Sequence, residues 1–254
     1  KTRQRKKEDK FILEGTRIIK EAEKAGVNIQ KIFLISELKE NKEIKPLIKN
    51  KNVKYVDKDL LFSTASTVNP QGIIAVVDKP DYSGEKIRGK KKILVLDRIQ
   101  DPGNMGTLIR TASAAGMEGI IALKGCVDIY NLKVLKATMG AIFEIPIITR
   151  MELTKFLKIK RNLNFNLYAA DLEAETYYCE VDYEEPFFIV IGNEGGGLRK
   201  EILDSSDRKI KIPILGKIDS LNAAVSGAII MYEYVSEKIL SETQPPQDFN
   251  ELVN

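Results

Sequence analysis

Three stretches of the sequence, residues 93–112, 187–199 and 210–227, place polar side chains or glycines directly after an apolar run. In parallel sheets the loops that follow strands meet at one edge, and ligands bind there. The polar side chains suited to chemistry are Asn104 and Arg110 in the first stretch, Asn193 and Glu194 in the second, and Ser220 and Asn222 in the third. Such groups can orient a substrate and manage a proton. We therefore treat them as candidates for one shared site.

Histidine is absent from the sequence, which excludes Ser-His-Asp and Cys-His catalysis and every metal site built on histidine. The two cysteines, Cys126 and Cys179, form no Cys-x-x-Cys pair, so a structural zinc site is excluded as well. A disulfide framework is equally unexpected, and this cysteine usage suits a reducing cytosol. An enzyme of this composition must rely on other polar side chains or on a bound cofactor, and we expect no metal.

Three of the candidates also have an ordinary structural interpretation. Asn104 follows turn residues and is suited to capping the next helix. Arg110 is equally typical of a surface arginine. Ser220 is suited to capping the last helix, whose small residues allow close packing. Taken one at a time, these residues leave the choice between structure and function open.

The second stretch has three consecutive glycines, Gly195 to Gly197, which let a backbone pass close to a ligand or to another chain. The Walker pattern fails because Gly197 is followed by Leu198 and Arg199. The dinucleotide pattern fails because the glycine spacing is wrong. Glu194 would also repel phosphate, so the sequence argues against nucleoside triphosphate binding.

Apolar strands alternate with helices in the second part of the chain, which indicates an α/β fold with a mostly parallel, covered sheet. The expected strands are residues 93–96, 120–123, 166–170, 187–191 and 209–212. The expected helices are residues 106–115, 132–143, 152–158, 198–203 and 221–240. Each candidate loop would then lie at the carboxyl end of a strand.

A smaller α/β unit precedes this sheet. From Lys10 onward the sequence predicts a helix closed by Gly26 at the position after its last turn. Further strands are expected at residues 32–35, 53–56 and 73–77, and a further helix at 58–65. Residues 78–92 are rich in turn formers and charge, which is typical of a linker. We therefore expect domains at residues 1–77 and 93–254.

Charge is distributed unevenly between these two parts. Residues 1–92 carry 23 basic against 13 acidic side chains, an excess of ten positive charges, whereas the remainder carries 17 against 23. A basic N-terminal part indicates that the protein binds a polyanion. A lysine-rich surface that is only solvated would give the same excess of positive charge. The cations expected to contact such a polyanion are Arg3, Arg5, Lys6, Lys7, Lys10 and Arg17. With 43% hydrophobic residues and no apolar run of membrane-spanning length, we expect a protein without a membrane segment.

Taken together, the three stretches resemble the signature motifs of the SpoU (TrmH) branch of the SPOUT RNA methyltransferases. The matching patterns are Asn104-x-Gly106-x-x-x-Arg110-x-Ala112, Gly192-Asn193-Glu194-Gly195-x-Gly197-Leu198 and Ile212-Pro213 followed by Asp219-Ser220-Leu221-Asn222, and Lys136-Ala-Thr-Met-Gly-Ala141 is also similar. Each motif is weak alone, but three in order, each after a strand, are specific. The resemblance covers about residues 93–240. Residues 1–77 resemble, less specifically, the L30e-like substrate-binding domain that often precedes this catalytic domain.

The resemblance implies S-adenosylmethionine as the methyl donor and a ribose 2′-hydroxyl of RNA as the acceptor. It also implies a homodimer and a deep trefoil knot, which composition and periodicity do not predict. The residues implied in catalysis are Arg110, Asn104, Glu194, Ser220 and Asn222, with Arg110 meeting the RNA phosphate and ribose. The residues implied in cofactor binding are Gly192, Asn193, Ile212 and Leu221. Because arginine stays charged in proteins, we expect Arg110 to orient and polarise rather than to act as a base.

The sequence thus predicts a cytoplasmic enzyme that methylates RNA, with 23S ribosomal RNA as the expected substrate because the N-terminal domain is present. Two alternatives stay open. One is a transfer RNA 2′-O-methyltransferase, and the other is a non-catalytic RNA-binding or ribosome-assembly protein that keeps the fold. Intact Arg110, Glu194, Ser220 and Asn222 argue against the second alternative.

Overall fold

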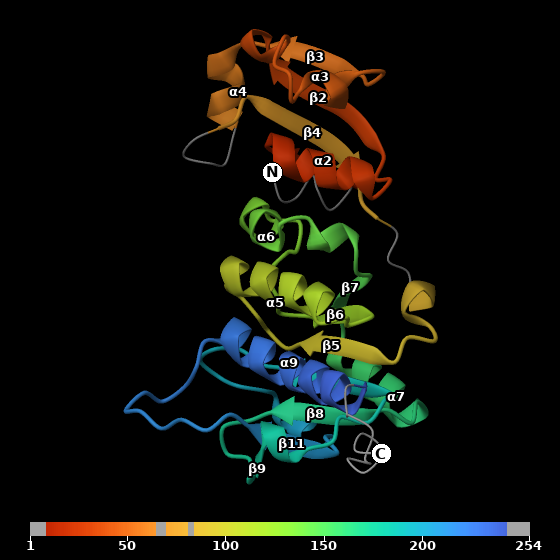
Figure 1. Cartoon of the computed structure of the whole chain (residues 1–254), viewed down its shortest axis with the longest axis vertical. Helices are drawn as coiled ribbons and strands as arrows, with labels where there is room; N and C mark the ends of the chain where they lie inside the picture. Colours follow the sequence, from red (N-terminus) through yellow and green to blue (C-terminus); the bar gives the residue numbers. More distant parts are fainter. Residues whose placement is uncertain (1–8, 65–69, 81–83, 243–254) are drawn as a thin grey trace, which may run out of the picture.

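The chain folds into two sheets, each with its own helices, as Figure 1 shows. The structure is a computed structural model, and it describes residues 9–64, 70–80 and 84–242. In the view of Figure 1 the N-terminal sheet lies above the larger sheet, and helix α6 (Leu132–Thr138) lies between the two.

Within the described residues, the N-terminal sheet has four strands in the order β1-β4-β2-β3. Its strands are β1 Lys10–Glu14, β2 Ile29–Ile35, β3 Val53–Val56 and β4 Ile73–Asp78, and its helices are α2 Thr16–Lys24, α3 Lys45–Ile48 and α4 Lys58–Thr64, with the 3-10 turn η1 Ser36–Leu38. β4 is antiparallel to β1 and to β2, whereas β2 and β3 are parallel. The strands that the sequence predicts in this part are therefore present.

Strand β1 replaces the first part of the helix that the sequence predicts from Lys10 onward. Phe11 and Leu13 are buried, whereas Ile12 is 40% exposed. This alternation has the period of a strand, and β1 pairs along its whole length with β4. The helix begins only after Gly15, whose φ of 106° turns the chain from the strand into α2.

Within the described residues, the larger sheet has seven parallel strands in the order β7-β6-β5-β10-β8-β11-β9. They are β5 Lys92–Leu96, β6 Gly119–Leu123, β7 Ile147–Met151, β8 Asn166–Ala170, β9 Thr176–Tyr177, β10 Phe187–Ile191 and β11 Arg208–Lys211. This confirms the parallel sheet that the alternation of strands and helices predicts. The two edge strands, β7 and β9, are additional to the predicted set.

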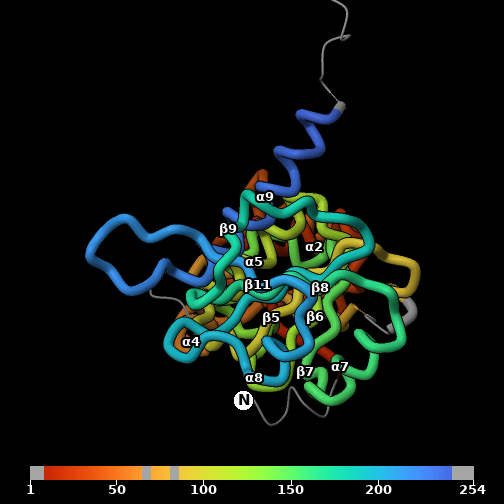
Figure 2. The backbone as a smooth tube through the Cα atoms, turned by 90° about the horizontal axis from the view of Figure 1, so that it is seen from below, coloured from red at the N-terminus to blue at the C-terminus, as the bar shows by residue number. Residues whose placement is uncertain are grey.

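Helices cover both faces of the larger sheet, as the end-on view in Figure 2 shows. The remaining elements are α5 Pro102–Ala114, α7 Leu153–Asn162, α8 Lys200–Leu203 and α9 Ala223–Glu242, with the 3-10 turns η2 Gly84–Ile87, η3 Ala141–Phe143 and η4 Tyr178–Glu180. Strand β10 separates two cores. Phe187, Ile189 and Ile191 pack in the core under α5 and α9, and Phe188 and Val190 pack in the core under α7 and α8.

The helix predicted at residues 132–143 is interrupted. It ends at Thr138 because Met139 and Gly140 have positive φ angles of 53° and 100°. A Cβ atom on Gly140 would lie 2.9 Å from the Cβ of Glu21 on α2. The interruption therefore lets this part of the chain approach the N-terminal domain closely.

The two sheets share one continuous core. Phe11 of β1 contacts Tyr130, with ring centroids 4.6 Å apart, and Phe143, with ring centroids 6.4 Å apart. Leu13 and Leu135 belong to the same buried cluster, which reaches down to the larger sheet. The N-terminal domain is therefore packed against α6 and its flanking turns.

Candidate functional site

A cavity of about 410 Å³ lies at the carboxyl ends of β8, β10 and β11. Residues from the loops that follow these strands line it, together with the first turns of α9. Because all strands of this sheet are parallel, these loops emerge at the same edge, which is where open α/β sheets bind ligands. The cavity is therefore where the sequence predicts a site.

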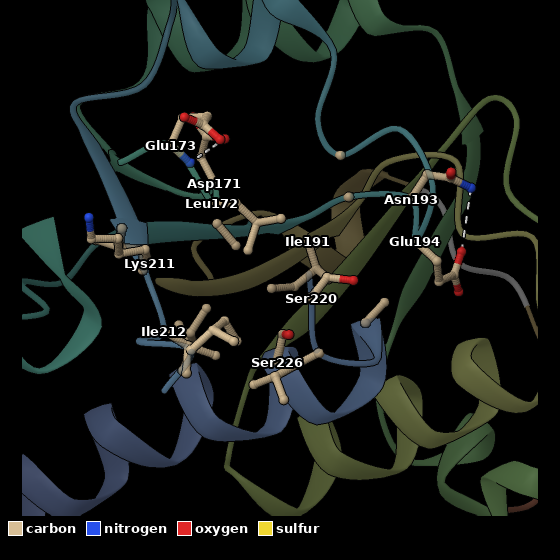
Figure 3. A pocket seen from close by; sticks show the side chains of 18 of the residues that line it. Asp171, Leu172, Glu173, Ile191, Asn193, Glu194, Lys211, Ile212, Ser220 and Ser226 are labelled. Atoms are coloured by element: carbon tan, nitrogen blue, oxygen red, sulfur yellow. Dashed lines mark hydrogen bonds between the residues drawn. The ribbon is translucent and has the colours of Figure 1, made fainter. Parts of the chain in front are cut away.

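Apolar side chains form much of the cavity wall. Figure 3 shows Leu172, Ile191 and Ile212 directed toward the centre of the cavity, with Ser220 beside them. Gly192, Asn193, Glu194 and Leu221 also line it. The structure thus brings together six of the predicted residues, namely Gly192, Asn193, Glu194, Ile212, Ser220 and Leu221.

The glycine-rich loop after β10 folds back on itself at the cavity mouth. A Cβ atom on Gly192 would lie 2.5 Å from the carbonyl carbon of Gly197, so only glycine fits there. The backbone groups of Asn193 and Gly197 exchange hydrogen bonds of 3.1 and 2.9 Å. The side-chain oxygen of Asn193 accepts hydrogen bonds from the N–H groups of Gly195 and Gly196, at 3.0 and 3.1 Å. Asn193 therefore holds the loop in shape as well as facing the cavity.

A hydrogen-bonded chain joins the three motifs at this edge. Asn104 donates from its amide nitrogen to Oε1 of Glu194. Its amide oxygen accepts a hydrogen bond from Nδ2 of Asn222 at 2.9 Å. Glu194 lines the cavity, whereas Asn104 and Asn222 do not. The orientation of the Glu194 carboxylate is thus set by one residue from each of the other two motifs.

The caps of the two helices differ from those that the sequence predicts. Asp101 caps α5, because its Oδ1 accepts a hydrogen bond from the N–H of Asn104 at 2.8 Å. Asn222 caps α9, because its Oδ1 accepts from the N–H groups of Ala224 and Val225 at 2.9 and 3.3 Å. Neither Asn104 nor Ser220 is a helix cap. Because neither side chain caps a helix, both can interact with other groups at the edge of the cavity, as Asn104 does with Glu194.

Asp97, which is buried, and Arg199, which is partly exposed, form an ion pair that lies outside the sequence motifs. Asp97 has no exposed surface and follows β5 directly. Its carboxylate accepts hydrogen bonds from Nε, Nη2 and the backbone N–H of Arg199, at 2.8, 2.5 and 3.1 Å. Arg98 in turn donates from Nη2 to the carbonyl of Gly197 at 3.1 Å. The sequence signal that could have identified Asp97 is its position: it directly follows an apolar run and directly precedes an arginine, Arg98.

Arg110 lies on α5, exposed, and is not part of the cavity wall. Its guanidinium forms no hydrogen bond or ion pair with any of the residues that the structure describes.

The run Lys136–Ala141 lies on α6 and the turn after it, where Ala137 packs against Gly106 of α5. The structure therefore places this run in the helix packing rather than at the cavity.

Of the cations predicted to contact RNA, Arg3, Arg5, Lys6 and Lys7 lie outside the described residues. Lys10 begins β1, and Arg17 is exposed in the first turn of α2. Arg17 and Lys20 line a hollow of about 390 Å³ on the N-terminal domain, next to Gln71, which accepts a hydrogen bond from the N–H of Thr16 at 2.9 Å. Two of the predicted cations thus lie on the N-terminal domain.

Cys126 and Cys179 are both free thiols. Burial raises the pKa of the Cys126 thiol to about 11, which keeps it protonated at neutral pH.

Among the described residues there is no cluster of three or more acidic or cysteine side chains placed to hold a metal ion. None of the helices in this part of the chain is long and apolar enough to cross a membrane.

Comparison with known proteins matches both parts of the chain. A model of the SpoU rRNA Methylase family matches residues 91–232, and a model of the MRM3-like substrate binding domain matches residues 1–75. The chain is 31% identical to the 23S rRNA (guanosine(2553)-2'-O)-methyltransferase RlmP of Bacillus subtilis, over 91% of this chain and 90% of that protein. It is 30% identical to the mitochondrial rRNA methyltransferase 3 of Mus musculus, over 90% of this chain and 68% of that protein.

The fold is also that of solved structures. The SpoU methyltransferase AviRb from Streptomyces viridochromogenes, in complex with the cofactor AdoMet, has a TM-score of 0.85 and 25% sequence identity, over 94% of each chain. The likeness therefore extends over both sheets. The knotted C-terminal segment expected from the sequence follows from this fold.

Proposed function

The chain belongs to the SpoU rRNA methylase family, and from this premise we propose that it transfers a methyl group from S-adenosylmethionine to a ribose 2′-hydroxyl of ribosomal RNA. The observation that carries the proposal is the hydrogen-bonded chain from Asn222 through Asn104 to Glu194. It fixes a carboxylate at the mouth of a cavity that also presents apolar walls and backbone groups. The names of the relatives in Bacillus subtilis and Mus musculus supply the substrate class.

The residues of the cavity fit the adenosyl part of S-adenosylmethionine. Leu172, Ile191 and Ile212 offer apolar surface to a flat base. The backbone at Gly192 and Leu221, which both line the cavity, would hold the polar edges and the ribose. The bound cofactor supplies an already activated methyl group, so the protein has to align the acceptor and handle one proton.

On the acceptor side, we propose that Arg110 meets the RNA phosphate and orients the ribose. Its guanidinium is exposed and has no partner within the described part of the chain, so it is available to an anion. Glu194 would hold the ribose hydroxyl or the proton that it releases. Ser220, which lines the cavity beside Glu194, would position the reacting groups.

We further propose that residues 1–77 bind the substrate RNA, that residues 78–92 link the domains, and that residues 93–254 form the catalytic domain. The break between the two sheets supports the division, because the first sheet ends with β4 at Asp78 and the second begins with β5 at Lys92. The exposed Arg17 and the excess of positive charge support RNA binding by the first domain.

Free thiols at Cys126 and Cys179 support a reducing compartment, and we place the protein in the cytoplasm.

A homodimer built around α9 completes the proposal. The small residues of α9 face α5, since a Cβ on Gly227 would collide with Leu108. The opposite side of α9 exposes Val225 (47%), Tyr232 (45%) and Ile239 (55%). A helix face of this kind fits an interface between copies. Light scattering at micromolar concentration should give the mass of a dimer, and a monomeric mass would refute this part of the proposal.

Mapping of 2′-O-methyl groups in the RNA of a strain that lacks this protein tests the proposal. We expect one ribose methylation to disappear from 23S ribosomal RNA. The wild-type chain should restore it, and the Arg110→Ala chain should not. Loss of a methyl group from transfer RNA would replace the ribosomal substrate with a transfer RNA. Unchanged methylation, together with no binding of S-adenosylmethionine in calorimetry, would leave only an RNA-binding or ribosome-assembly role.

A further inference from the structure

A second cavity, of about 530 Å³, lies on the face of the larger sheet that α7 covers. It begins at Ile93 and Phe188, near the amino ends of β5 and β10. Ile191, which lines the catalytic cavity, is at the other end of β10 and on the other face of the sheet. The second cavity is therefore separate from the proposed catalytic site, and its volume is typical of a site for a small ligand.

The floor of this cavity is made entirely of apolar side chains. Residues at its base include Ile93, Ile121, Ile148 and Phe188, and Leu163, which is 43% exposed, lies at its mouth. The lining has no serine, threonine, asparagine, glutamine or acidic side chain among the described residues. A ligand that fills the cavity must therefore bring an apolar body, because the floor offers no side-chain partner for polar edges.

Every charged side chain among the described residues that line the cavity is positive. Arg88, Lys90, Lys91 and Lys155 line the cavity, and none of the four forms an ion pair within the described residues. The nearby carboxylate of Glu118 is engaged by the backbone N–H groups of Lys91 and Lys92, at 2.6 and 3.2 Å, and does not line the cavity. An anionic group at the mouth would thus meet cations without an acidic competitor in the lining.

The same lining does not suit an RNA base. Recognition of unpaired bases uses exposed aromatic faces for stacking and polar groups for the base edges. Here the rings of Phe165 and Phe188 stack on each other with centroids 4.7 Å apart, and Phe156 meets Phe188 edge-on at 5.4 Å. The aromatic faces are thus engaged within the protein. What remains for a ligand is aliphatic surface and positive charge.

We propose that this cavity binds a soluble single-chain amphiphile, an alkyl or acyl chain whose anionic head is held by Arg88, Lys90, Lys91 and Lys155. The chain replaces water on the carbon-lined floor, and the carboxylate or phosphate head stays at the rim. The proposal rests on this cavity alone and does not depend on the proposed methyl transfer.

Calorimetry of the full-length chain with decanoate, below the concentration at which it forms micelles, tests the proposal. We expect saturable binding of one decanoate. Butyrate, which has the same head and a shorter chain, should bind at least about a hundredfold more weakly, because each buried methylene adds to the affinity. Decanol, which has the chain without the charge, should bind more weakly than decanoate, and added salt should reduce that difference. No saturable binding of decanoate would overturn the proposal.

Two variants locate the binding. Leu163→Glu places a carboxylate at the mouth of the cavity, at a half-exposed position that tolerates it, and should weaken decanoate at least about tenfold. Arg88→Gln with Lys155→Gln should remove most of the preference for decanoate over decanol. Lys158→Gln with Arg161→Gln removes the same number of positive charges from the protein, at positions on α7 that do not line the cavity, and should bind as the wild type does. Thermal unfolding establishes that each variant is folded.

Three other outcomes would also overturn the proposal. If the protein binds vesicles of anionic phospholipid but not free decanoate, the basic rim is a membrane-facing surface. If single-stranded RNA displaces decanoate and loses affinity in the Arg88→Gln/Lys155→Gln variant, the rim is part of the RNA path. Equal decanoate affinity in Leu163→Glu and in the wild type would place the binding elsewhere on the molecule.

Discussion

Asn104 connects the three motifs through a single side chain. It donates to Glu194 and accepts from Asn222, so its two amide atoms have opposite roles. An amide can bridge a carboxylate and an amide donor in this way, whereas aspartate in its place would bring two carboxylates together. The residue type that the motif requires is therefore explained by its neighbours, which lie 90 and 118 positions away in the sequence.

Arg110→Ala should separate methyl transfer from cofactor binding. Because Arg110 is exposed and lies outside the cavity wall, binding of S-adenosylmethionine in calorimetry should stay near the wild-type value. Methyl transfer should fall at least about a hundredfold, the low end for a group that manages a proton or orients the reacting atoms. Arg161→Ala, on α7, is the matched control and should leave both quantities unchanged. Near-normal turnover of Arg110→Ala would refute its role.

Asn222→Asp separates helix capping from positioning of Glu194. Aspartate caps helices as well as asparagine, so the melting temperature should change little. The variant loses the Nδ2 donor to Asn104. A carboxylate oxygen at position 222 then faces the amide oxygen of Asn104, so two acceptors meet in the hydrogen-bonded chain that ends at Glu194. We expect methyl transfer to fall about tenfold or more, since preorganised polar groups are lost. In Asn222→Ala the cap is lost as well, and stability should fall by about 1 kcal/mol. Equal activity of Asn222→Asp and the wild type would contradict the positioning role.

Glu237 gives the stability a defined pH dependence. Burial, together with the nearby carboxylates of Glu233 and Asp182, raises the pKa of Glu237 above its usual value of 4.5. The folded chain then binds this proton more tightly than the unfolded chain, so ionised Glu237 destabilises the fold at neutral pH. Glu237→Gln should therefore raise the melting temperature at pH 8, and the gain should disappear as the pH falls toward 4.5. The exposed Glu201→Gln, the control for net charge, should show no such dependence.

At the scale of elements, the strands and helices of the larger sheet were predictable because each has a clear apolar pattern. Strands 166–170 and 187–191 have the predicted bounds. The failures have a common cause, because tertiary contacts decide them. Residues 10–14 form a strand because β4 offers a pairing edge, and the break after Thr138 lies where the chain comes close to Glu21 of the N-terminal domain. Neither contact can be predicted from the residues that are neighbours in the sequence.

The candidate site was predictable only in part for the same reason. The three motifs identified Glu194, Ser220 and Leu221, which line the cavity. They could not distinguish Asn104 from a helix cap, because the true caps depend on which side chain turns back to the backbone. Asp97 and Arg199 lie 102 positions apart, and their pairing required the parallel contact of β5 with β10.

Packing of α5 against α6 depends on Gly106. A Cβ atom there would collide with the Cβ of Ala137 and would lie 2.8 Å from the carbonyl oxygen of Val134. Backbone cannot move aside as a flexible side chain does, so Gly106→Ala should cost about 1–3 kcal/mol of stability, as expected for overpacking. Thr107→Ala, at the next and exposed position of the same helix, should cost much less. Chemical denaturation measures both, and equal stability of the two variants would contradict the close contact.

At the scale of the whole molecule, the continuous core joins the N-terminal domain to the larger sheet. Phe11 packs on Tyr130 and Phe143, so the N-terminal domain is seated on the elements that adjoin α5. α5 carries both Asn104 and Arg110. RNA bound by the first domain, as proposed, would therefore be presented at a set position relative to the proposed catalytic edge. Removing this domain would expose Tyr130 and Phe143. The contribution of the domain is better tested by charge than by truncation.

Lys10→Gln with Arg17→Gln should weaken RNA binding without disturbing the fold. Both cations lie on the N-terminal domain, and neither has an ion-pair partner among the described residues. Each phosphate contact releases counterions, so losing two contacts should make the plot of log affinity against log salt shallower by about 1.5 units. Filter binding at several salt concentrations measures this slope. Lys158→Gln with Arg161→Gln removes the same charge from α7, on the catalytic domain, and should leave the slope unchanged. If both pairs of substitutions have the same effect, the basic N-terminal domain acts only through net charge and is not the RNA-binding module.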